Sequence, residues 1–257
     1  MSQHSLEAAV REAGIDVPPV WFEETASTND EALVLAARGA PEWTVVAAGH
    51  QTAGRGRQGR SWLSVPGKLL QFTLLLRPPL APHEAPLTSL LAAAEMARAC
   101  RKAAGVEVRS KWPNDLLAGG RKVGGILAEA RVQGDAVEHL FLGIGVNVGL
   151  EEADLPADLR GRATSLELEG GTVEPMALLG TFLAGFKEAW RPAEEGYARR
   201  AVLAYREVCD TIGRSVRATT VDGTVVEGVA ERLDDRGGLV VDGRTVSFGE
   251  IAHLERP

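Results

Sequence analysis

The sequence predicts an α+β protein in which helices pack on a mixed or antiparallel sheet, followed by a small β-domain. Three strand-like segments follow one another across tight turns between residues 115 and 150, whereas the helical patterns occur in separate blocks. This order is typical of α+β folds and not of a doubly wound parallel sheet. After residue 210 the chain changes to short alternating segments separated by Asp- and Gly-rich turns, which predicts a second domain.

Helices and strands alternate in the first part of the chain. A leading helix is expected over residues 5–13. A second helix begins at the Ser27-Thr28 pair, where Thr28 and Glu31 form a capping box, and Gly39 suits its end. Strands are expected over residues 43–49 and 69–76, a glycine- and arginine-rich loop over 50–67, and a longer helix over 87–104.

The second part begins with strands and ends with the small domain. A strand over residues 106–112 ends at Pro113, and Gly119-Gly120 joins the next two strands as a hairpin. A third strand is expected over 136–150, and residues 175–208 are expected to be helical with an interruption at Pro192. Four strands follow, over residues 215–220, 225–233, 238–242 and 244–248, and predict a β-barrel of SH3-like size. We therefore expect two domains, 1–209 and 210–257.

The composition is that of a globular protein and excludes several classes. Of the 257 residues, 45% are hydrophobic and 25% charged, and no apolar run is long enough to cross a membrane. The first twenty residues carry acids and lack the apolar core of a signal peptide. Cys100 and Cys209 form neither a disulfide framework nor a metal-binding pair. The net charge of −7 argues against binding to nucleic acid or membranes, and we expect a cytoplasmic protein.

The charge is unevenly distributed. From Trp43 to His83 there is no acidic residue but five basic ones, which either chance or a small anionic ligand would explain. The Gly-Arg-Gly-Arg-Gln-Gly run in this segment matches a dinucleotide fingerprint, but the chain then continues into a strand and not into the helix that the fingerprint needs. A flexible loop with the guanidinium groups of Arg55, Arg57 and Arg60 suits phosphate binding instead.

Further polar and aromatic residues are candidates for a ligand site. The chain has only five lysines against twenty-three arginines, so Lys111 and Lys122, both next to glycine or proline turns, are candidates for function or for a solvated turn. Trp62 could stack on a base or anchor the loop. Asn147 lies in a glycine-containing strand, which suggests close approach of a ligand, and its amide could read an adenine edge. The Ser27-Thr28-Asn29 segment could cap a helix or bind a polar ligand.

Five motifs occur in a fixed order and together carry a resemblance. They are Ser-Thr-Asn (27–29), Gln-Thr-Ala-Gly-Arg-Gly-Arg-Gln-Gly-Arg-Ser-Trp (51–62), Lys-Trp-Pro-Asn-Asp (111–115), Lys-Val-Gly-Gly-Ile-Leu-Ala-Glu (122–129) and Gly-Ile-Gly-Val-Asn-Val (143–148). This set resembles the biotin protein ligase family. The resemblance implies a catalytic domain similar to class II aminoacyl-tRNA synthetases, with an SH3-like domain after it. Gln58 stands where many members have another basic residue, and we expect this difference to have only a mild effect on ligand affinity.

Some members of that family carry an N-terminal helix-turn-helix domain and also act as repressors. Only about twenty-five residues precede the motifs here, so we expect neither DNA binding nor a repressor role.

The resemblance implies that the enzyme activates biotin with Mg²⁺ and ATP to biotinyl-5′-AMP. It then transfers biotin to a lysine on the biotin carboxyl carrier domain of acyl-CoA or pyruvate carboxylases. No permanent protein-bound metal is expected. By position, the resemblance implies that biotin is bound by Ser27, Thr28, Asn29, Gln51, Gly54, Arg55, Gly56, Arg57 and Lys111. It implies a nucleotide site of Arg55, Arg57, Trp62, Lys122 and Asn147, with Lys111 and Arg57 as the catalytic residues.

Three other functions are consistent with parts of the sequence. A lipoate or octanoate ligase would share the fold and the adenylate chemistry, but the Arg-Arg-x-Ser-Gly-Gly-Gly loop usual in lipoate ligases does not occur in this sequence. A non-catalytic protein that sequesters biotin would be favoured by loss of Lys111 or Arg57, and both are present. Nucleic-acid binding through the arginine loop is disfavoured by the acidic net charge.

Overall fold

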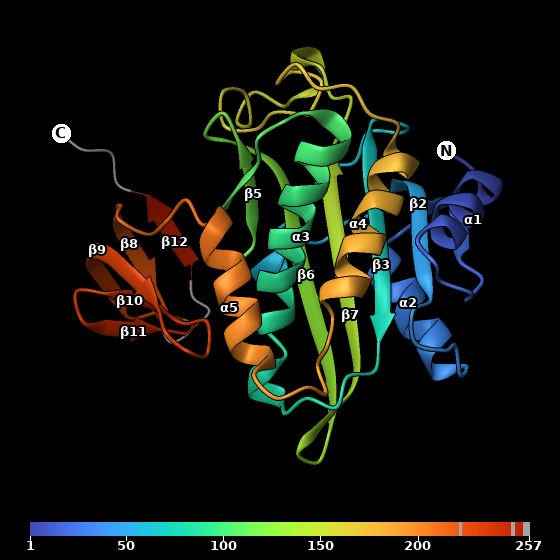
Figure 1. Ribbon diagram of the computed structural model, residues 1–257. Helices are drawn as coiled ribbons and strands as arrows, with labels where there is room; N and C mark the ends of the chain where they lie inside the picture. Colours follow the sequence, from blue (N-terminus) through green and yellow to red (C-terminus); the bar gives the residue numbers. More distant parts are fainter. Residues whose placement is uncertain (221–222, 248–249, 254–257) are drawn as a thin grey trace.

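A computed structural model describes residues 1–220, 223–247 and 250–253 and contains two sheets (Figure 1). The first is a seven-stranded mixed sheet with the order β1-β2-β3-β7-β6-β5-β4, and the second is a five-stranded antiparallel sheet with the order β11-β10-β9-β8-β12. The predicted α+β class is therefore confirmed. Among the described residues, no helix is long and apolar enough to cross a membrane.

The elements have the following bounds. The helices are α1 (Gln3–Glu12), α2 (Thr28–Ala37), α3 (Leu87–Ala104), α4 (Pro175–Ala189) and α5 (Tyr197–Val208). The first sheet consists of β1 (Val20–Thr25), β2 (Val45–Gln51), β3 (Leu69–Leu76), β4 (Arg109–Lys111), β5 (Asp115–Ala118), β6 (Arg121–Gln133) and β7 (Ala136–Asn147). The second consists of β8 (Ser215–Thr219), β9 (Val225–Leu233), β10 (Leu239–Val241), β11 (Arg244–Val246) and β12 (Glu250–His253).

Helices cover both faces of the first sheet. In Figure 1, α3, α4 and α5 lie over one face, and the second sheet lies beside α5. Strand β3 is buried along its whole length, because its side chains alternate between the two faces and helices pack on both of them. Phe72 and Leu74 belong to the main core with α3 and α4, whereas Leu75 packs against Ala32 and Ala36 of α2 on the opposite face. The α2 face also carries the polar positions of β3, Gln71 and Thr73.

Several sequence-based boundaries were wrong. Strand β1 was not expected, because its sequence Val-Trp-Phe-Glu-Glu-Thr lacks a clear alternation, and it lies at the sheet edge, parallel to β2. The expected strand over 43–49 begins two residues later because Trp43 has a positive φ of 70°. The segment 106–112 is a strand only at Arg109–Lys111, and the interruption at Pro192 between α4 and α5 is confirmed.

Among the residues that the structure describes, the small domain has one strand more than expected. Strand β12 pairs with β8 and gives five strands in place of four. Residues 221–222, 248–249 and 254–257 of the expected second domain, among them residue 248 of the expected fourth strand, lie outside the described residues. Closure of this sheet into an SH3-like barrel stays a prediction.

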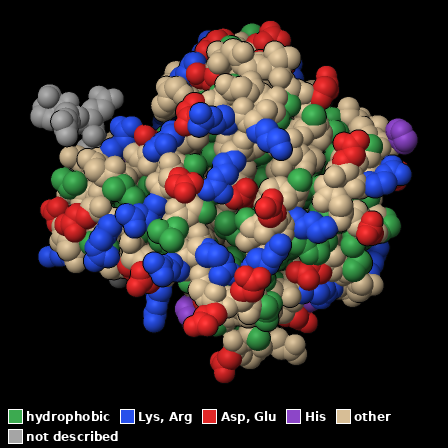
Figure 2. All heavy atoms as spheres, viewed as in Figure 1, with side chains coloured by type: hydrophobic (Ala, Val, Ile, Leu, Met, Phe, Trp, Pro, Cys, Tyr) green, Lys and Arg blue, Asp and Glu red, His purple; other side chains and the backbone are tan. Residues whose placement is uncertain are grey.

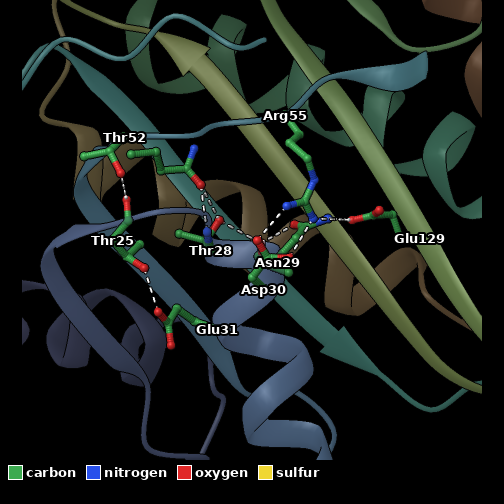
Figure 3. Close-up of polar contacts among 10 residues, drawn as sticks. Thr25, Thr28, Asn29, Asp30, Glu31, Thr52, Arg55 and Glu129 are labelled. Atoms are coloured by element: carbon green, nitrogen blue, oxygen red, sulfur yellow. Dashed lines mark hydrogen bonds and ion pairs between the residues drawn. The ribbon is translucent and has the colours of Figure 1, made fainter. Parts of the chain in front are cut away.

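The predicted capping box at Thr28 and Glu31 is wrong. Ser27 is the residue at the N-cap of α2, and its side chain makes no capping hydrogen bond. Glu31 instead accepts a hydrogen bond from the Thr25 hydroxyl at 2.7 Å, and Thr28 donates to Gln51 (Figure 3). The end of the helix is as expected, with Gly39 at a positive φ of 86° just after it. The polar side chains at the start of α2 are thus engaged in contacts with the sheet and not in a cap.

The outer face of the helices carries charges of both signs. Figure 2 shows lysine and arginine side chains interspersed with aspartate and glutamate over this face. The face does not present a continuous basic surface of the kind that binds a polyanion.

Candidate active site

Two rows of residues cross the first sheet on the α2 side, and all of them except Gln71 and Thr73 line a pocket. Residues directly opposite each other in antiparallel strands point to the same face. The register therefore places in one row Lys111 of β4, Asp115 of β5, Gly125 of β6, Gly145 of β7 and Gln71 of β3. The next row contains Leu127, Gly143 and Thr73. A lysine, a carboxylate and a buried amide thus lie on one face, with a glycine-lined depression between them.

The glycines leave room for side chains from above. A β-carbon on Gly145 would lie 2.6 Å from the Trp62 indole, and one on Gly143 would lie 2.3 Å from Asn29 Oδ1. The indole therefore lies directly on the floor, with the Lys122 ammonium 5.6 Å from the ring centroid. Its Nε1 is buried and has no hydrogen-bond partner in the part of the chain that the structure describes. Such an unsatisfied buried donor is rare, and it lies directly against Gly145.

The N-terminus of α2 forms the polar end of the pocket. Asn29 donates from Nδ2 to Glu129 at 2.6 Å and accepts from the Thr73 hydroxyl at 2.5 Å. The backbone N–H of Thr28 donates to Gln51 Oε1 at 2.7 Å. Thr28, Asn29 and Thr73 are buried, so their polar atoms need partners, and those partners determine how the side chains are oriented.

The arginine-rich loop is attached to the pocket by ion pairs. Figure 3 shows Arg55 extending toward Asp30 of α2, with Glu129 of β6 on the other side of its guanidinium. The two nitrogens Nη1 and Nη2 donate to Asp30 at 2.6 and 2.7 Å, and Nη2 lies 3.6 Å from Glu129. The hydrogen bond to Asp30 raises the pKa of Arg55. Arg57 Nη1 donates to Asn114 Oδ1 at 3.3 Å. The loop is thus held across the pocket from α2 to the turn before β5.

The two candidate lysines have different surroundings. Lys122 Nζ pairs with Asp115 at 2.6 Å. Lys111 is half-buried, and its ammonium makes no hydrogen bond or ion pair within 4 Å to the residues that the structure describes. Burial lowers the pKa of Lys111, an effect that Asp115 partly offsets and Lys122 reinforces. Lys111 is therefore a desolvated cation that faces a ligand space, which is the state expected of a group that neutralises an anionic substrate.

Residues in the chain after α5 hold the strand that carries Lys111. The buried indole of Trp112 donates to the Gly237 carbonyl at 2.9 Å, and the Trp112 backbone N–H donates to the Thr211 hydroxyl at 2.9 Å. On the other side, the Asp210 N–H donates to the Ser110 carbonyl at 2.7 Å. Both neighbours of Lys111 are therefore bonded to residues after α5, which restrains the lysine.

The structure brings ten of the twelve expected site residues to this pocket. They are Ser27, Thr28, Asn29, Gln51, Arg55, Gly56, Arg57, Trp62, Lys111 and Lys122. Gly54 lies behind them, where a β-carbon would be 3.2 Å from Gln51 Nε2, and Asn147 lies outside the lining, with its amide donating to the Thr164 carbonyl at 2.8 Å. Sequence reasoning missed Asp30, Gln71, Thr73 and Glu129. Gln71 and Thr73 could have been found from their pairing with Gly145 and Gly143 in β7. That pairing is known only once the strand register is known.

Gly143→Ala should weaken binding of biotin, the ligand that the resemblance of the motifs implies. The added methyl group would lie 2.3 Å from Asn29 Oδ1, and Asn29 would have to leave Thr73 and Glu129. Overpacking of this kind costs about 1–3 kcal/mol, so we expect the dissociation constant for biotin, measured by calorimetry, to rise about tenfold or more. Gly180→Ala in α4 adds the same methyl group at an ordinary 3.4 Å contact and should leave binding unchanged. Equal affinity of the two variants would contradict a ligand position at Asn29.

The described residues contain no group of three or more His, Cys, Asp or Glu side chains that could hold a metal ion. The basic side chains among the residues that line the pocket are Arg55, Arg57, Arg60, Lys111 and Lys122.

Comparison with known proteins agrees with the motifs and the site. The model of the biotin/lipoate A/B protein ligase family matches residues 21–147, and that of the biotin protein ligase C-terminal domain matches residues 211–254. A biotin–[acetyl-CoA-carboxylase] ligase of Mycobacterium tuberculosis is 35% identical over 244 residues, which cover 90% of this chain and 87% of the relative. The bifunctional ligase/repressor BirA of Bacillus subtilis is 35% identical over 224 residues, 87% of this chain and 69% of the relative.

A solved structure shows the same relationship. The biotin protein ligase of Aquifex aeolicus in complex with biotin and ATP superposes with a TM-score of 0.74 at 26% identity and covers 93% of this chain and 99% of that one. Two family models, relatives matched over most of their length and a shared fold all agree. The chain therefore belongs to the biotin/lipoate A/B protein ligase family, as a biotin protein ligase.

Proposed function

We propose that this pocket forms biotinyl-5′-AMP, with biotin bound at the α2 end and ATP at the end with Trp62 and Lys122. One observation carries the assignment: a single pocket joins a neutral polar end, made by Ser27, Thr28 and Gln51, to a strongly cationic end. A ligand with an uncharged hydrogen-bonding head and a carboxylate tail fits the first part. The phosphates of a nucleotide fit the second.

The first half-reaction joins two anions. A biotin carboxylate oxygen attacks the α-phosphorus of ATP, the bond from that phosphorus to the bridging oxygen of the β-phosphate breaks, and pyrophosphate leaves. The enzyme must offset the repulsion between carboxylate and phosphate and align them, for which positioned cations suffice without a covalent enzyme intermediate. We assign this role to Lys111 and Arg57, because Lys111 is desolvated and Arg57 bridges the loop to Asn114.

The nucleotide would lie over the glycine-lined floor. The Trp62 indole lies there, with the Lys122 ammonium 5.6 Å from the ring centroid. We propose that the base stacks on Trp62 and that Lys122 contacts the phosphate. Mg²⁺ would enter with ATP, bound mainly by the phosphate oxygens, as is usual for Mg²⁺ in nucleotide enzymes. The Asn147 amide would contact the nucleotide only after giving up its hydrogen bond to the Thr164 carbonyl.

The second half-reaction requires a carrier protein. The ε-amine of one lysine attacks the acyl carbon of biotinyl-5′-AMP, the bond to the phosphate oxygen breaks, AMP leaves, and the nitrogen loses a proton to give the amide. We propose the biotin carboxyl carrier domain of a carboxylase as the acceptor, in line with the name of the Mycobacterium tuberculosis relative.

We also propose that the chain divides into a ligase domain of residues 1–209 and a barrel of residues 210–257. We further propose a cytoplasmic location, with which two free, buried cysteines are compatible.

The experiment is biotin-dependent exchange of labelled pyrophosphate into ATP by the purified protein with Mg²⁺, because it measures adenylation without a carrier. We expect exchange with biotin and none with lipoate or octanoate. Exchange with lipoate alone would assign the pocket to another acid of the same chemical type. Tight biotin binding without exchange would contradict the catalytic assignment.

A further inference from the structure

A smaller side cavity adjoins the pocket beside Arg57. Its volume is about 150 Å³, which is room for several groups of the size of a water molecule, at about 30 Å³ each. It shares five lining residues with the pocket and has three of its own. The shared residues are Arg57, Pro113, Asn114, Ile126 and Leu127, and the others are Pro86, Ser89 and Ala128.

The side cavity lies where the cover of strand β6 by β5 ends. The pairing of β5 with β6 extends no further than Gly125, and the residues of β6 that line the side cavity come directly after it. The start of α3 contributes Pro86 and Ser89. These two residues and Ala128 are partly exposed, whereas the shared residue Pro113 is buried. The side cavity therefore leads from the surface to the pocket.

Arg57 and Asn114 stand between the two spaces, because both residues line each of them and they are hydrogen-bonded to each other. Asn114 Nδ2 donates to the Ile126 carbonyl at 2.9 Å, and the Ile126 N–H donates to the Asn114 backbone carbonyl at 3.0 Å. A carbonyl oxygen can only accept, so the Asn114 amide is not free to reverse and its Oδ1 faces Arg57. Asn114 thus presents a fixed acceptor at the junction.

The lining of the side cavity suits an alkyl chain that ends in an uncharged amine. Of its eight residues five are apolar, and none of those that the structure describes there is acidic. An ammonium ion would lose its hydration without gaining a counter-charge, and it would lie near Arg57. Both effects lower the pKa of an amine, so the neutral form is favoured. Its methylene groups would contact the apolar wall, and an N–H would reach Asn114 Oδ1.

We propose that the side cavity binds the side chain of the acceptor lysine and delivers its neutral ε-amine to the acyl carbon of biotinyl-5′-AMP. The inference rests on the proposed transfer of biotin to a carrier, and it names the place where the lysine enters. The carboxyl group of biotin is assigned to Lys111, which precedes Pro113 by two residues. The side cavity therefore opens toward the reacting end of biotin.

In this arrangement the nucleophile needs no general base before it attacks. Asn114 Oδ1 accepts one N–H of the amine and leaves the nitrogen lone pair free. The bond from nitrogen to the acyl carbon forms, the bond from that carbon to the phosphate oxygen breaks, and AMP leaves with the electron pair. The nitrogen then releases a proton to water, which gives the amide. An amine that is desolvated and lies beside another cation is activated in this way.

A series of alkylamines tests the proposal without a carrier or a variant. The purified full chain is given preformed biotinyl-5′-AMP and methylamine, ethylamine, propylamine or butylamine, and formation of the biotin amide is measured by chromatography. We expect kcat/KM for the amine to rise about fourfold with each methylene, since each one is buried against the apolar wall. The same reaction without enzyme provides the baseline. An enzymatic series as flat as that baseline would overturn the proposal.

Ser89→Leu fills the side cavity and changes no residue that lines the pocket. We expect kcat/KM for the carrier and for butylamine to fall at least about tenfold, because the added side chain occupies the place of the lysine. Pyrophosphate exchange should stay within about twofold of the wild type. If carrier labelling falls but the butylamine reaction does not, Ser89 contacts only the surface of the carrier and the side cavity is not the lysine site.

Ala184→Leu is the matched control. Ala184 is an exposed alanine of α4 that lines a different groove and neither the pocket nor the side cavity. It should leave carrier labelling and the butylamine reaction at the wild-type rate. The use of preformed biotinyl-5′-AMP separates this inference from the proposed function. A wild-type protein without pyrophosphate exchange contradicts the adenylation step, while the alkylamine series still decides whether the side cavity binds the lysine.

Discussion

Lys111→Ala should abolish biotin transfer to the carrier, a loss of at least about a hundredfold, while the protein stays folded. The Lys111 ammonium is desolvated, and burial lowers its pKa. A preorganised cation of this kind stabilises charge that develops as carboxylate and phosphate approach, and removal of one such group costs about 10²–10³ in rate. Because the charge is held in a partly desolvated place without an ion-pair partner among the described residues, its removal should not lower Tm. The rates of pyrophosphate exchange and of carrier labelling are measured for the variant and the wild type, and Tm is measured for both by thermal melting.

Lys102→Ala is the control for this experiment, since Lys102 is an exposed lysine in the last turn of α3. It should label the carrier at the wild-type rate. Lys122→Ala provides a second comparison within the pocket. It removes the partner of Asp115, so the carboxylate is left unpaired near Lys111, and a loss of affinity for ATP is expected. A Lys111→Ala enzyme with normal exchange would transfer the catalytic role to Lys122.

The motifs predicted the site better than they predicted the contacts within it. Ser27, Thr28, Gln51 and Lys111 come together in the pocket although they lie on three segments of the chain. Each lies at an end of a strand or helix that meets the same face of the sheet. The predicted capping box at Thr28 was wrong because the partner of Thr28 is distant in sequence. Local spacing suggested Glu31 as the partner, but Gln51, 23 residues away, accepts from Thr28.

Glycine positions were predictable, but the groups that approach them were not. The Gly-Ile-Gly segment indicated close approach, and Gly143 and Gly145 do lie against Asn29 and Trp62. Which side chains these are depends on the pairing of β7 with β3 and β6, and that register is a long-range property of the sheet. The acidic partners of the loop, Asp30 and Glu129, were missed for the same reason.

The limits of the fold prediction have a similar origin. The apolar core strand β3 and the helix α3 were recognised because hydrophobicity and length suffice for buried elements. Strand β1 was not, because it is an edge strand with two exposed acids and its pairing with β2 is parallel. Strand β12 is only four residues long and is stabilised by β8, more than thirty positions earlier.

Arg57→Gly should loosen retention of biotinyl-5′-AMP. Arg57 connects the loop to Asn114 at 3.3 Å, so the substitution removes a bond that holds the loop over the pocket and adds backbone freedom next to Gly56 and Gly59. An opened loop would release the reactive anhydride before the carrier arrives. We expect exposed lysines of an added bystander protein to become biotinylated at least about tenfold faster, as read by streptavidin blotting, since a lost charged hydrogen bond weakens retention by about that factor.

The argument depends on Arg57 acting through the loop and not through general destabilisation. Arg236→Gly is the matched control, because Arg236 is an exposed arginine in a loop of the second sheet, away from the pocket lining. It should leave bystander labelling at the wild-type level. Asp30→Asn weakens the other attachment of the loop, the Arg55 pair, and should raise bystander labelling in the same direction but less, because Arg55 keeps Glu129 as a second partner. If Arg57→Gly slows carrier labelling and leaves bystander labelling unchanged, Arg57 serves catalysis alone and the loop does not retain the adenylate.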